Sequence, residues 1–196
     1  MAEAETTLLT RFGRTVIGPA TGLLVDQPVQ AIIYAANTRG VMGAGPAGSV
    51  RLAGGSEVER ELMAAAPFDI GTAVVTDSGR LVERGIEAVI HAVVTSHLGA
   101  TAEMADVRRA LTAALRLADS RRFRTLAVPL LGLSAVATIE ERRERVDAIV
   151  EDVVAHLRRG GSRCESVVIV TRFDDDVLMM AARVKRARQR LWTNQG

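Results

Sequence analysis

Residues 31–37 read Ala-Ile-Ile-Tyr-Ala-Ala-Asn, and residues 40–48 follow closely with Gly-Val-Met-Gly-Ala-Gly-Pro-Ala-Gly. The first stretch is a short apolar run, which is typical of a strand covered on both faces of a sheet. It ends in the amide side chain of Asn37. The glycine-rich loop behind it exposes backbone N–H groups, and Pro46 indicates the start of a helix whose first amides point back at the loop. The stretch therefore predicts a pocket for a nucleotide or a phosphosugar.

The apolar residues along the rest of the chain alternate between the period of a strand and that of a helix, which is typical of α/β domains. We predict strands over residues 15–21, 29–35, 72–76, 87–95, 126–131 and 167–171, and a short one within 7–12. We predict helices over residues 46–53, 56–67, 103–118 and 138–159, and a terminal helix capped by Asp174 or Asp175. The helices at Ser56 and Thr138 both open on a capping-box sequence.

The chain shows no linker and no repeat, and its composition fits one globular domain. At 196 residues with 48% hydrophobic content, it can bury roughly 70% of the surface that its unfolded form exposes. We predict a single α/β domain over residues 1–196, with its core at about 14–187 and a short basic tail at 183–196.

Several classes of function are not expected. The one cysteine, Cys164, excludes an internal disulfide, and we expect it to be a small buried side chain. No His, Cys or carboxylate set has ligand spacing, so we predict no metal and no cofactor. Residues 1–5 are acidic where a secretory signal is basic, and the longest uncharged run, residues 125–139, is too short to span a bilayer. We therefore expect a cytoplasmic protein without membrane contact.

The order of strands and helices also predicts where a ligand lies. Strand, helix, strand connections favour parallel pairing with right-handed crossovers, and ligands in open α/β sheets lie beyond the carboxyl ends of the strands. The loops after Ala35, Leu131 and Thr171 should therefore converge. Two loops would offer amides to an elongated diphosphate, an amide side chain would bond a ribose hydroxyl, and an aromatic ring would pack on a base.

Four landmarks, in this order along the chain, resemble the macro domain family. They are Asn37 at the end of a buried strand, the glycine loop leading to Gly48-Ser-Val-Arg-Leu-Ala-Gly-Gly55, the segment Ala88-Val-Ile-His-Ala92, and the segment Ala127-Val-Pro-Leu-Leu-Gly132. The resemblance implies a three-layer α/β/α domain with a mixed, mostly parallel central sheet. It also implies binding of ADP-ribose or of an ADP-ribosylated macromolecule.

The resemblance and the predicted topology together give a set of candidate site residues. Asn37 is the only catalytic candidate, and its plainer interpretation is an asparagine favoured in a turn after a strand. The expected ligand-binding residues are Ala20, Asn37, Gly43, Ala44, Gly45, Pro46, Ala47, Gly48, Ser49, Gly132, Leu133, Ser134, Ala135 and Phe173. If the protein is an enzyme, the resemblance implies a weak hydrolase of ADP-ribosyl bonds or of ADP-ribose phosphate.

The chain departs from the family pattern at four places. Pro19 stands where an acidic residue usually reads the adenine amino group, and Tyr34 replaces the first residue of the usual Asn-Ala-Ala-Asn. Ala47 stands where hydrolytic members commonly place an aspartate. The second phosphate loop reads Gly-Leu-Ser-Ala-Val-Ala over residues 132–137, where glycines are usual. These departures predict weak selection of the base and slow or absent hydrolysis, and they leave open whether the second loop admits a ligand.

Other interpretations remain open. Residues 43–48 match the dinucleotide fingerprint GxGxxG of NAD(P)-dependent Rossmann oxidoreductases, although no strand directly precedes Gly43. The glycines also suit an ordinary flexible loop. A third interpretation is a scaffold that has lost ligand binding and contacts a partner through basic residues 183–190. The same residues are candidates for a weak contact with nucleic acid or another anionic polymer.

The three histidines have separate interpretations. His91 lies mid-strand between apolar neighbours and is expected to be a hydrogen-bonded core residue. His97, beyond that strand, could reach the rim of the crevice. His156 lies in the last turn of a helix, where a partial positive charge is favourable without any further role.

Overall fold

The structure, a computed structural model, describes residues 8–134 and 136–193. In this part of the chain a seven-stranded sheet has the order β1-β2-β7-β6-β3-β5-β4. Its strands are β1 Thr10–Phe12, β2 Thr15–Thr21, β3 Ala31–Asn37, β4 Ala73–Asp77, β5 Ala88–Thr95, β6 Thr125–Pro129 and β7 Ser166–Thr171. The strands from β2 to β5 in this order pair in parallel, whereas the edge strands β1 and β4 pair antiparallel with β2 and β5. The predicted mixed, mostly parallel sheet is confirmed.

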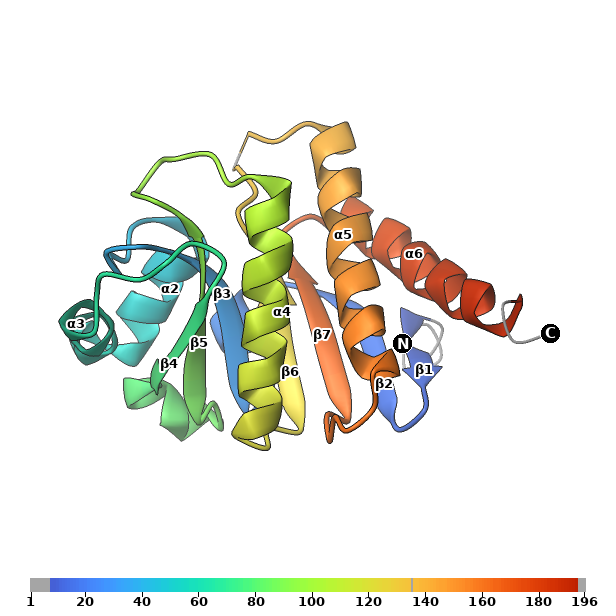
Figure 1. The fold of residues 1–196 in the computed structure, drawn as a ribbon, viewed down its shortest axis with the longest axis horizontal. Coiled ribbons are helices and arrows are strands. Elements are labelled where there is room, and N and C mark those ends of the chain that lie inside the picture. The colour runs from blue at the N-terminus through green and yellow to red at the C-terminus, as the bar shows by residue number, and fades with distance from the viewer. Residues whose placement is uncertain (1–7, 135, 194–196) are drawn as a thin grey trace.

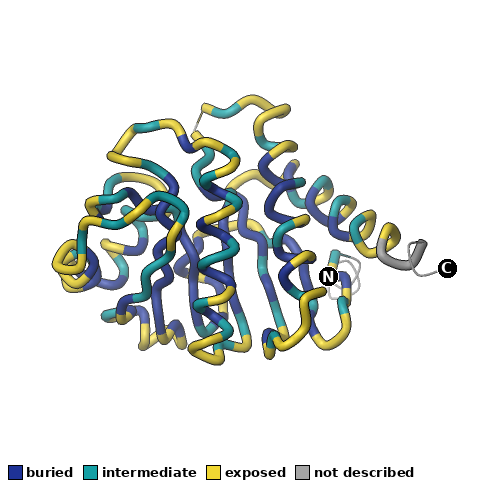
Figure 2. Tube along the Cα trace, in the orientation of Figure 1, coloured by how far each residue is buried: buried dark blue, intermediate teal, exposed yellow. Residues whose placement is uncertain are grey.

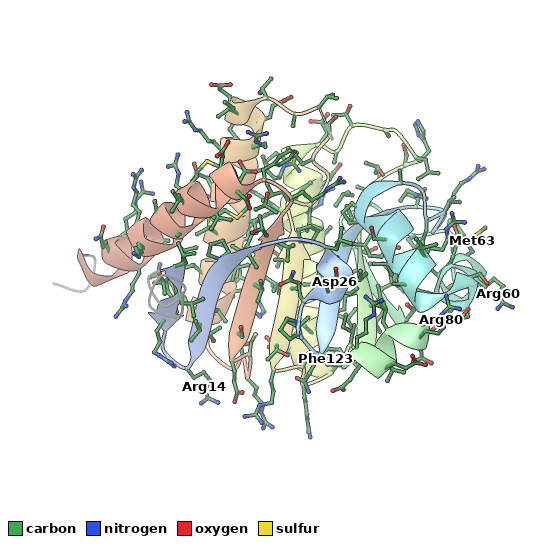
Figure 3. All side chains as sticks on the ribbon, turned by 180° about the vertical axis from the view of Figure 1, so that it is seen from behind. Arg14, Asp26, Arg60, Met63, Arg80 and Phe123 are labelled. Carbon is green, nitrogen blue, oxygen red and sulfur yellow. The ribbon has the colours of Figure 1, made fainter. Side chains whose placement is uncertain are left out.

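Helices cover both faces of the sheet, as the three-layer prediction required (Figure 1). They are α2 Gly45–Gly54, α3 Ser56–Ala64, α4 Met104–Ser120, α5 Ile139–Arg158 and α6 Asp174–Thr193, with the short 3-10 helices η1 Leu24–Asp26 and η2 Gly79–Arg84. Helices α4, α5 and α6 pack on the face that carries Ile33 and Ile90. Seen from behind, α2 and η1 lie over the opposite face (Figure 3).

The core follows from the apolar strands that the sequence shows. Alternate residues of β3 pack on opposite faces, so that Ile33 joins the core under α4 and α5 while Ile32 and Tyr34 join the core under α2. The buried residues are concentrated in the strands and on the inward sides of the helices, whereas the connecting loops are largely exposed (Figure 2). This rigid layer fixes the positions at which the loops leave it.

One of the two predicted capping boxes is wrong. Thr138 caps α5 as expected, since its side chain accepts the Glu141 N–H and the Glu141 carboxylate accepts the Thr138 N–H. At α3 the cap position belongs to Gly55, with φ of 103°, and Ser56 is already inside the helix. Because the helix starts one residue earlier than a serine cap requires, the Glu59 side chain is free for another role, described below.

The terminal helix α6 also starts earlier than expected. Asp174 is the first residue of α6, so neither it nor Asp175 precedes the helix as a cap. Both nevertheless lie in the first turn, where negative charge interacts favourably with the helix dipole.

Candidate functional site

The carboxyl ends of three neighbouring parallel strands lie side by side at one edge of the sheet. In the order β7-β6-β3 the strands end at Thr171, Pro129 and Asn37. The loops that follow therefore leave the sheet together, at the upper edge in Figure 1. This confirms the predicted convergence, and β5, on the other side of β3, ends at the same edge with Thr95.

Asn37 shapes the first of these loops. Its Nδ2 donates to the Val41 carbonyl at 2.7 Å, and its Oδ1 accepts the backbone N–H groups of Arg39 at 3.1 Å and Val41 at 3.3 Å. The side chain is only 4% exposed. This is the turn-forming role that was the plainer interpretation of Asn37. An amide nitrogen carries two hydrogens, and among the described residues Nδ2 bonds only the Val41 carbonyl.

Glu59 fixes the far end of the same loop. Its Oε1 accepts the Met42 N–H at 2.7 Å, and its Oε2 lies 3.6 Å from Arg51 Nη1 of α2. The residue that would complete a capping box at Ser56 thus anchors the glycine loop to α3.

The glycine loop is built for close approach of backbone to backbone. A Cβ at Gly48 would lie 2.5 Å from the Gly43 carbonyl oxygen, so a side chain there would displace the loop. Helix α2 begins at Gly45 with Ala44 as its cap, and no side chain bonds its first amides. Pro46 lacks an N–H, whereas the next amides of the helix are the orphan donors that attract anions at a helix N-terminus.

The second loop, after β6, is anchored from α5. Arg145 Nη1 donates to the Leu131 carbonyl at 2.7 Å. Gly132 has φ of 65°, and a Cβ there would lie 2.5 Å from the Ala102 Cβ and 3.3 Å from Arg145 Nη1. The glycine is therefore required for the loop to seat against its neighbours.

Two cavities open where these loops meet. The larger has a volume of about 590 Å³ and the smaller about 40 Å³. Pro46 and Pro129 line both, so the two cavities adjoin across the start of α2 and the end of β6. The larger is a typical size for a small-molecule site, and the two adjoining cavities together are called the crevice below.

The structure brings most of the candidate residues to this crevice. The larger cavity is lined by Asn37, Gly43, Ala44, Pro46, Ala47, Gly132, Leu133 and Ser134, and the smaller by Gly45, Pro46 and Ser49. Ala20, Gly48 and Phe173 line neither cavity. Ala135 lies outside the described residues.

Phe173 lies at the edge of the crevice, beside Arg172 of the smaller cavity. One ring face is taken by Arg142, whose guanidinium carbon lies 4.8 Å from the ring centroid. Arg142 in turn pairs with the buried Asp176 at 3.2 Å. The ring is 46% exposed, so its packing on a base stays a prediction.

Two groups of lining residues were missed from the sequence. The first lies between the end of β5 and the first residue of α4, where Leu98, Thr101 and Met104 line the larger cavity. From this segment only the exposed His97 was expected at the rim. The rest could have been predicted if the pairing of β5 with β3 had been known. The second is the start of α5, which contributes Glu141, Glu144 and Arg145. No local pattern distinguishes these from the solvated face of an amphipathic helix.

His91 is a core residue, as expected. Its Nδ1 lies 2.8 Å from the Tyr34 hydroxyl and its Nε2 lies 2.7 Å from Thr76 Oγ1. Because the Thr76 hydroxyl donates to the Asp77 carbonyl, it accepts from Nε2, and Nδ1 accepts the Tyr34 proton. Burial lowers the pKa of His91 to about 3, and burial together with the charge of Glu59 raises the pKa of Tyr34.

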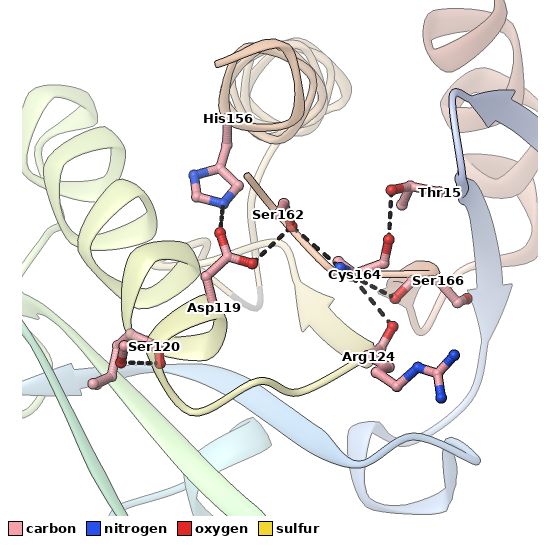
Figure 4. A network of polar contacts seen from close by, with 9 residues as sticks. Thr15, Asp119, Ser120, Arg124, His156, Ser162, Cys164 and Ser166 are labelled. Atoms are coloured by element: carbon pink, nitrogen blue, oxygen red, sulfur yellow. Dashed lines mark hydrogen bonds and ion pairs between the residues drawn. The ribbon is translucent and has the colours of Figure 1, made fainter. Parts of the chain in front are cut away.

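The polar residues around Cys164 lie at the opposite edge of the sheet, where β2, β6 and β7 begin (Figure 4). His156 Nε2 lies 2.6 Å from one Asp119 oxygen, and Ser162 donates to the other at 2.7 Å. Asp119 stands between the serine and the histidine, so the histidine cannot take the serine proton. Burial raises the pKa of Cys164 to about 12, which makes the thiol unreactive. The network therefore ties α4, α5 and β7 together.

No group of three or more His, Cys, Asp or Glu side chains in the described residues is arranged to hold a metal ion. In the same part of the chain, no helix has the length and apolar character needed to cross a membrane.

Comparison with known proteins gives the family. The family model of the macro domain matches residues 33–142. The chain belongs to the macro domain family. An uncharacterized protein of Aquifex aeolicus is 33% identical over 157 residues, which is 80% of this chain and 90% of that protein.

Solved macrodomains share the fold. A Trypanosoma brucei macrodomain in complex with ADP-ribose superposes with a TM-score of 0.74 at 18% identity, covering 86% of this chain and 68% of that one. A variant of the Oceanobacillus iheyensis macrodomain gives a TM-score of 0.78 at 14% identity, covering 93% and 97%. The oxidoreductase interpretation of the glycines is not supported, since β3 ends at Asn37, well before Gly43.

Proposed function

We propose that this macro domain binds ADP-ribose, free or attached to a macromolecule, along the crevice formed by its two adjoining cavities. The observation that carries the proposal is the uncapped start of α2, which lies between the cavities and lines both through Pro46. A diphosphate at that point would meet the orphan amides of the helix and of the glycine loop.

The two ends of the ligand have different surroundings. Asn37 lines the larger cavity, and its second Nδ2 hydrogen would suit a ribose hydroxyl. The nucleoside end would lie outside the smaller cavity, over the loop after β7 that carries Arg172 and the half-exposed Phe173. Pro19 offers no side-chain hydrogen bond to the base, so selection of adenine should be weak.

We propose that hydrolysis of ADP-ribosyl bonds, or of ADP-ribose phosphate, is slow. Ala47 lines the larger cavity, and its methyl side chain cannot act as a general base. Glu141 and Glu144 line the same cavity from α5. The Glu141 carboxylate, however, is engaged in capping α5 through the Thr138 N–H at 2.7 Å.

Thermal unfolding in the presence of ADP-ribose tests binding. At a free ligand concentration of about 100 times the dissociation constant, binding adds roughly 2.7 kcal/mol to the free energy of unfolding. Adenosine, which lacks the diphosphate, is the matched control and should give a smaller shift. An unchanged melting temperature at roughly millimolar ADP-ribose would contradict the proposal and favour a scaffold without ligand.

A second contact is favoured by the exposed basic residues of α6. Lys185, Arg186 and Arg188 are all exposed on this helix, which extends away from the sheet (Figure 1). We propose that they make a weak contact with an anionic polymer. Binding of a polyanion should fall steeply between about 50 and about 200 mM salt, and it should be lost when the three residues are replaced by glutamine.

A further inference from the structure

Arg145 is an unusual residue for the wall of a binding cavity. It lines the larger cavity from α5 and is nevertheless only 8% exposed. Nη1 is bonded to the Leu131 carbonyl at 2.7 Å, and Nε is buried without an acceptor among the described residues. The guanidinium has five N–H donors, so most of its hydrogen-bonding capacity is unused.

Its positive charge also lacks a close counter-charge. Within the described residues, no carboxylate lies at ion-pair distance from Arg145. Burial lowers the pKa of Arg145, while the charges of Glu141 and Glu144 raise it. Both carboxylates belong to exposed residues and are screened by solvent. A buried charge without a partner is costly to the fold, and a carbonyl could be bonded equally well by a neutral donor.

The position of Arg145 connects it to the second loop. The loop that it anchors reads Gly132-Leu-Ser-Ala-Val-Ala137, so Gly132 is the one glycine in this stretch of sequence. The bare Cα of Gly132 allows Arg145 Nη1 to approach. Arg145 thus holds the loop at Leu131 and places a cation beside Gly132 in the wall of the larger cavity.

We propose that Arg145 supplies the positive charge for a phosphate group of the bound ligand. This inference rests on the proposed function, because it concerns the same cavity. It names a residue that decides specificity: the cavity prefers ligands with a phosphate group over neutral nucleosides, and Arg145 is the source of that preference.

The test is calorimetric titration with ADP-ribose and with inorganic pyrophosphate, at low salt. Arg145→Met keeps an apolar stem and removes the charge, and it should weaken binding of both by about 10- to 100-fold, as expected for loss of a hydrogen bond to a charged group. Adenosine should bind the variant as it binds the wild type. Arg143→Met is the matched control, because Arg143 is an exposed neighbour on α5 that lines neither cavity.

The outcomes separate this inference from the proposed function. If wild type binds ADP-ribose and Arg145→Met binds it equally well, the inference is overturned and the proposed function stands. If wild type binds pyrophosphate through Arg145 but not ADP-ribose, the inference stands and the proposed function fails.

A second variant decides the matter if Arg145→Met does not fold. Arg145→Gln keeps a side-chain N–H donor for the Leu131 carbonyl and removes the charge. It should weaken binding of pyrophosphate and ADP-ribose by about 10- to 100-fold, as is expected of Arg145→Met. Wild-type affinity in Arg145→Gln would overturn the inference.

Discussion

The side chain of Asn37 donates a hydrogen bond to the Val41 carbonyl at 2.7 Å and accepts the Val41 N–H at 3.3 Å. One amide therefore closes the turn between β3 and the glycine loop from both sides. Because Asn37 is buried, these bonds hold the loop in the shape that forms the wall of the larger cavity. The residue that we propose to contact the ribose therefore also builds the loop that we propose to receive the diphosphate.

Replacing Asn37 by alanine should affect stability and binding together. The variant leaves the backbone groups of Val41 without their partner, which should cost about 1–3 kcal/mol in the free energy of unfolding. ADP-ribose affinity should fall as well, because the variant also loses the Nδ2 hydrogen that we propose to bond the ribose. Urea denaturation and calorimetry on the same preparations measure the two effects. Full stability in Asn37→Ala would show that other contacts hold the turn.

Replacing Gly48 by alanine should affect binding selectively. The added Cβ would lie 2.5 Å from the Gly43 carbonyl oxygen, so the glycine loop must shift. Loss of aligned amides should weaken ADP-ribose binding by about tenfold or more. Leu52→Ala is the control, since Leu52 lies on α2 and is 82% exposed. Equal affinities in the two variants would show that the loop does not contact the ligand.

The loops show what the sequence could predict and what it could not. The apolar run at 31–37 and the glycines that follow placed a strand, a loop and a helix correctly, because those signals are local. The capping box at Ser56 failed on an equally local detail, since Gly55 adopts φ of 103° and starts the helix first. Local signals are therefore dependable for the type of an element and less so for its first residue.

The missed part of the cavity depends on tertiary structure. Arg145 sits between Glu144 and Val146 in a helix with many charges, and nothing in that pattern distinguishes a buried arginine from a solvated one. Its burial arises only when the loop after β6 folds over α5. Similarly, the loop before α4 reaches the cavity because β5 pairs with β3, a pairing that the order of elements alone does not fix.

Introducing a carboxylate at Ala47 should raise hydrolysis. Ala47 lines the larger cavity, and a general base there could activate water, a role typically worth about 100- to 10,000-fold. Release of ADP-ribose from a modified protein should therefore be slow in wild type and faster in Ala47→Asp. Ala47→Asn is the control, because asparagine has the shape of aspartate without its basic carboxylate, and it should not raise the rate. Rapid wild-type turnover that survives Asn37→Ala and Ser49→Ala would place the catalytic residues elsewhere, with His97 the next to test.

The buried His91 should make stability depend on pH. Its folded pKa of about 3 lies below the unfolded value of 6.5, so the unfolded chain binds the proton more readily. His91 therefore leaves stability unaffected above pH 6.5 and reduces it by up to about 1.4 kcal/mol per pH unit as pH falls from about 6 toward 3. Urea denaturation across this range should show a shallower pH dependence in His91→Gln than in wild type. Parallel curves would mean that His91 takes up its proton in the folded protein.

The most direct test of the central claim is isothermal titration of the wild-type protein with ADP-ribose at low salt. We expect saturable binding at one site per chain, weakened in Gly48→Ala and unchanged in Leu52→Ala. The absence of any binding heat at several temperatures, at ligand concentrations of about 1 mM and with the protein shown to be folded, would contradict the claim that this crevice receives ADP-ribose.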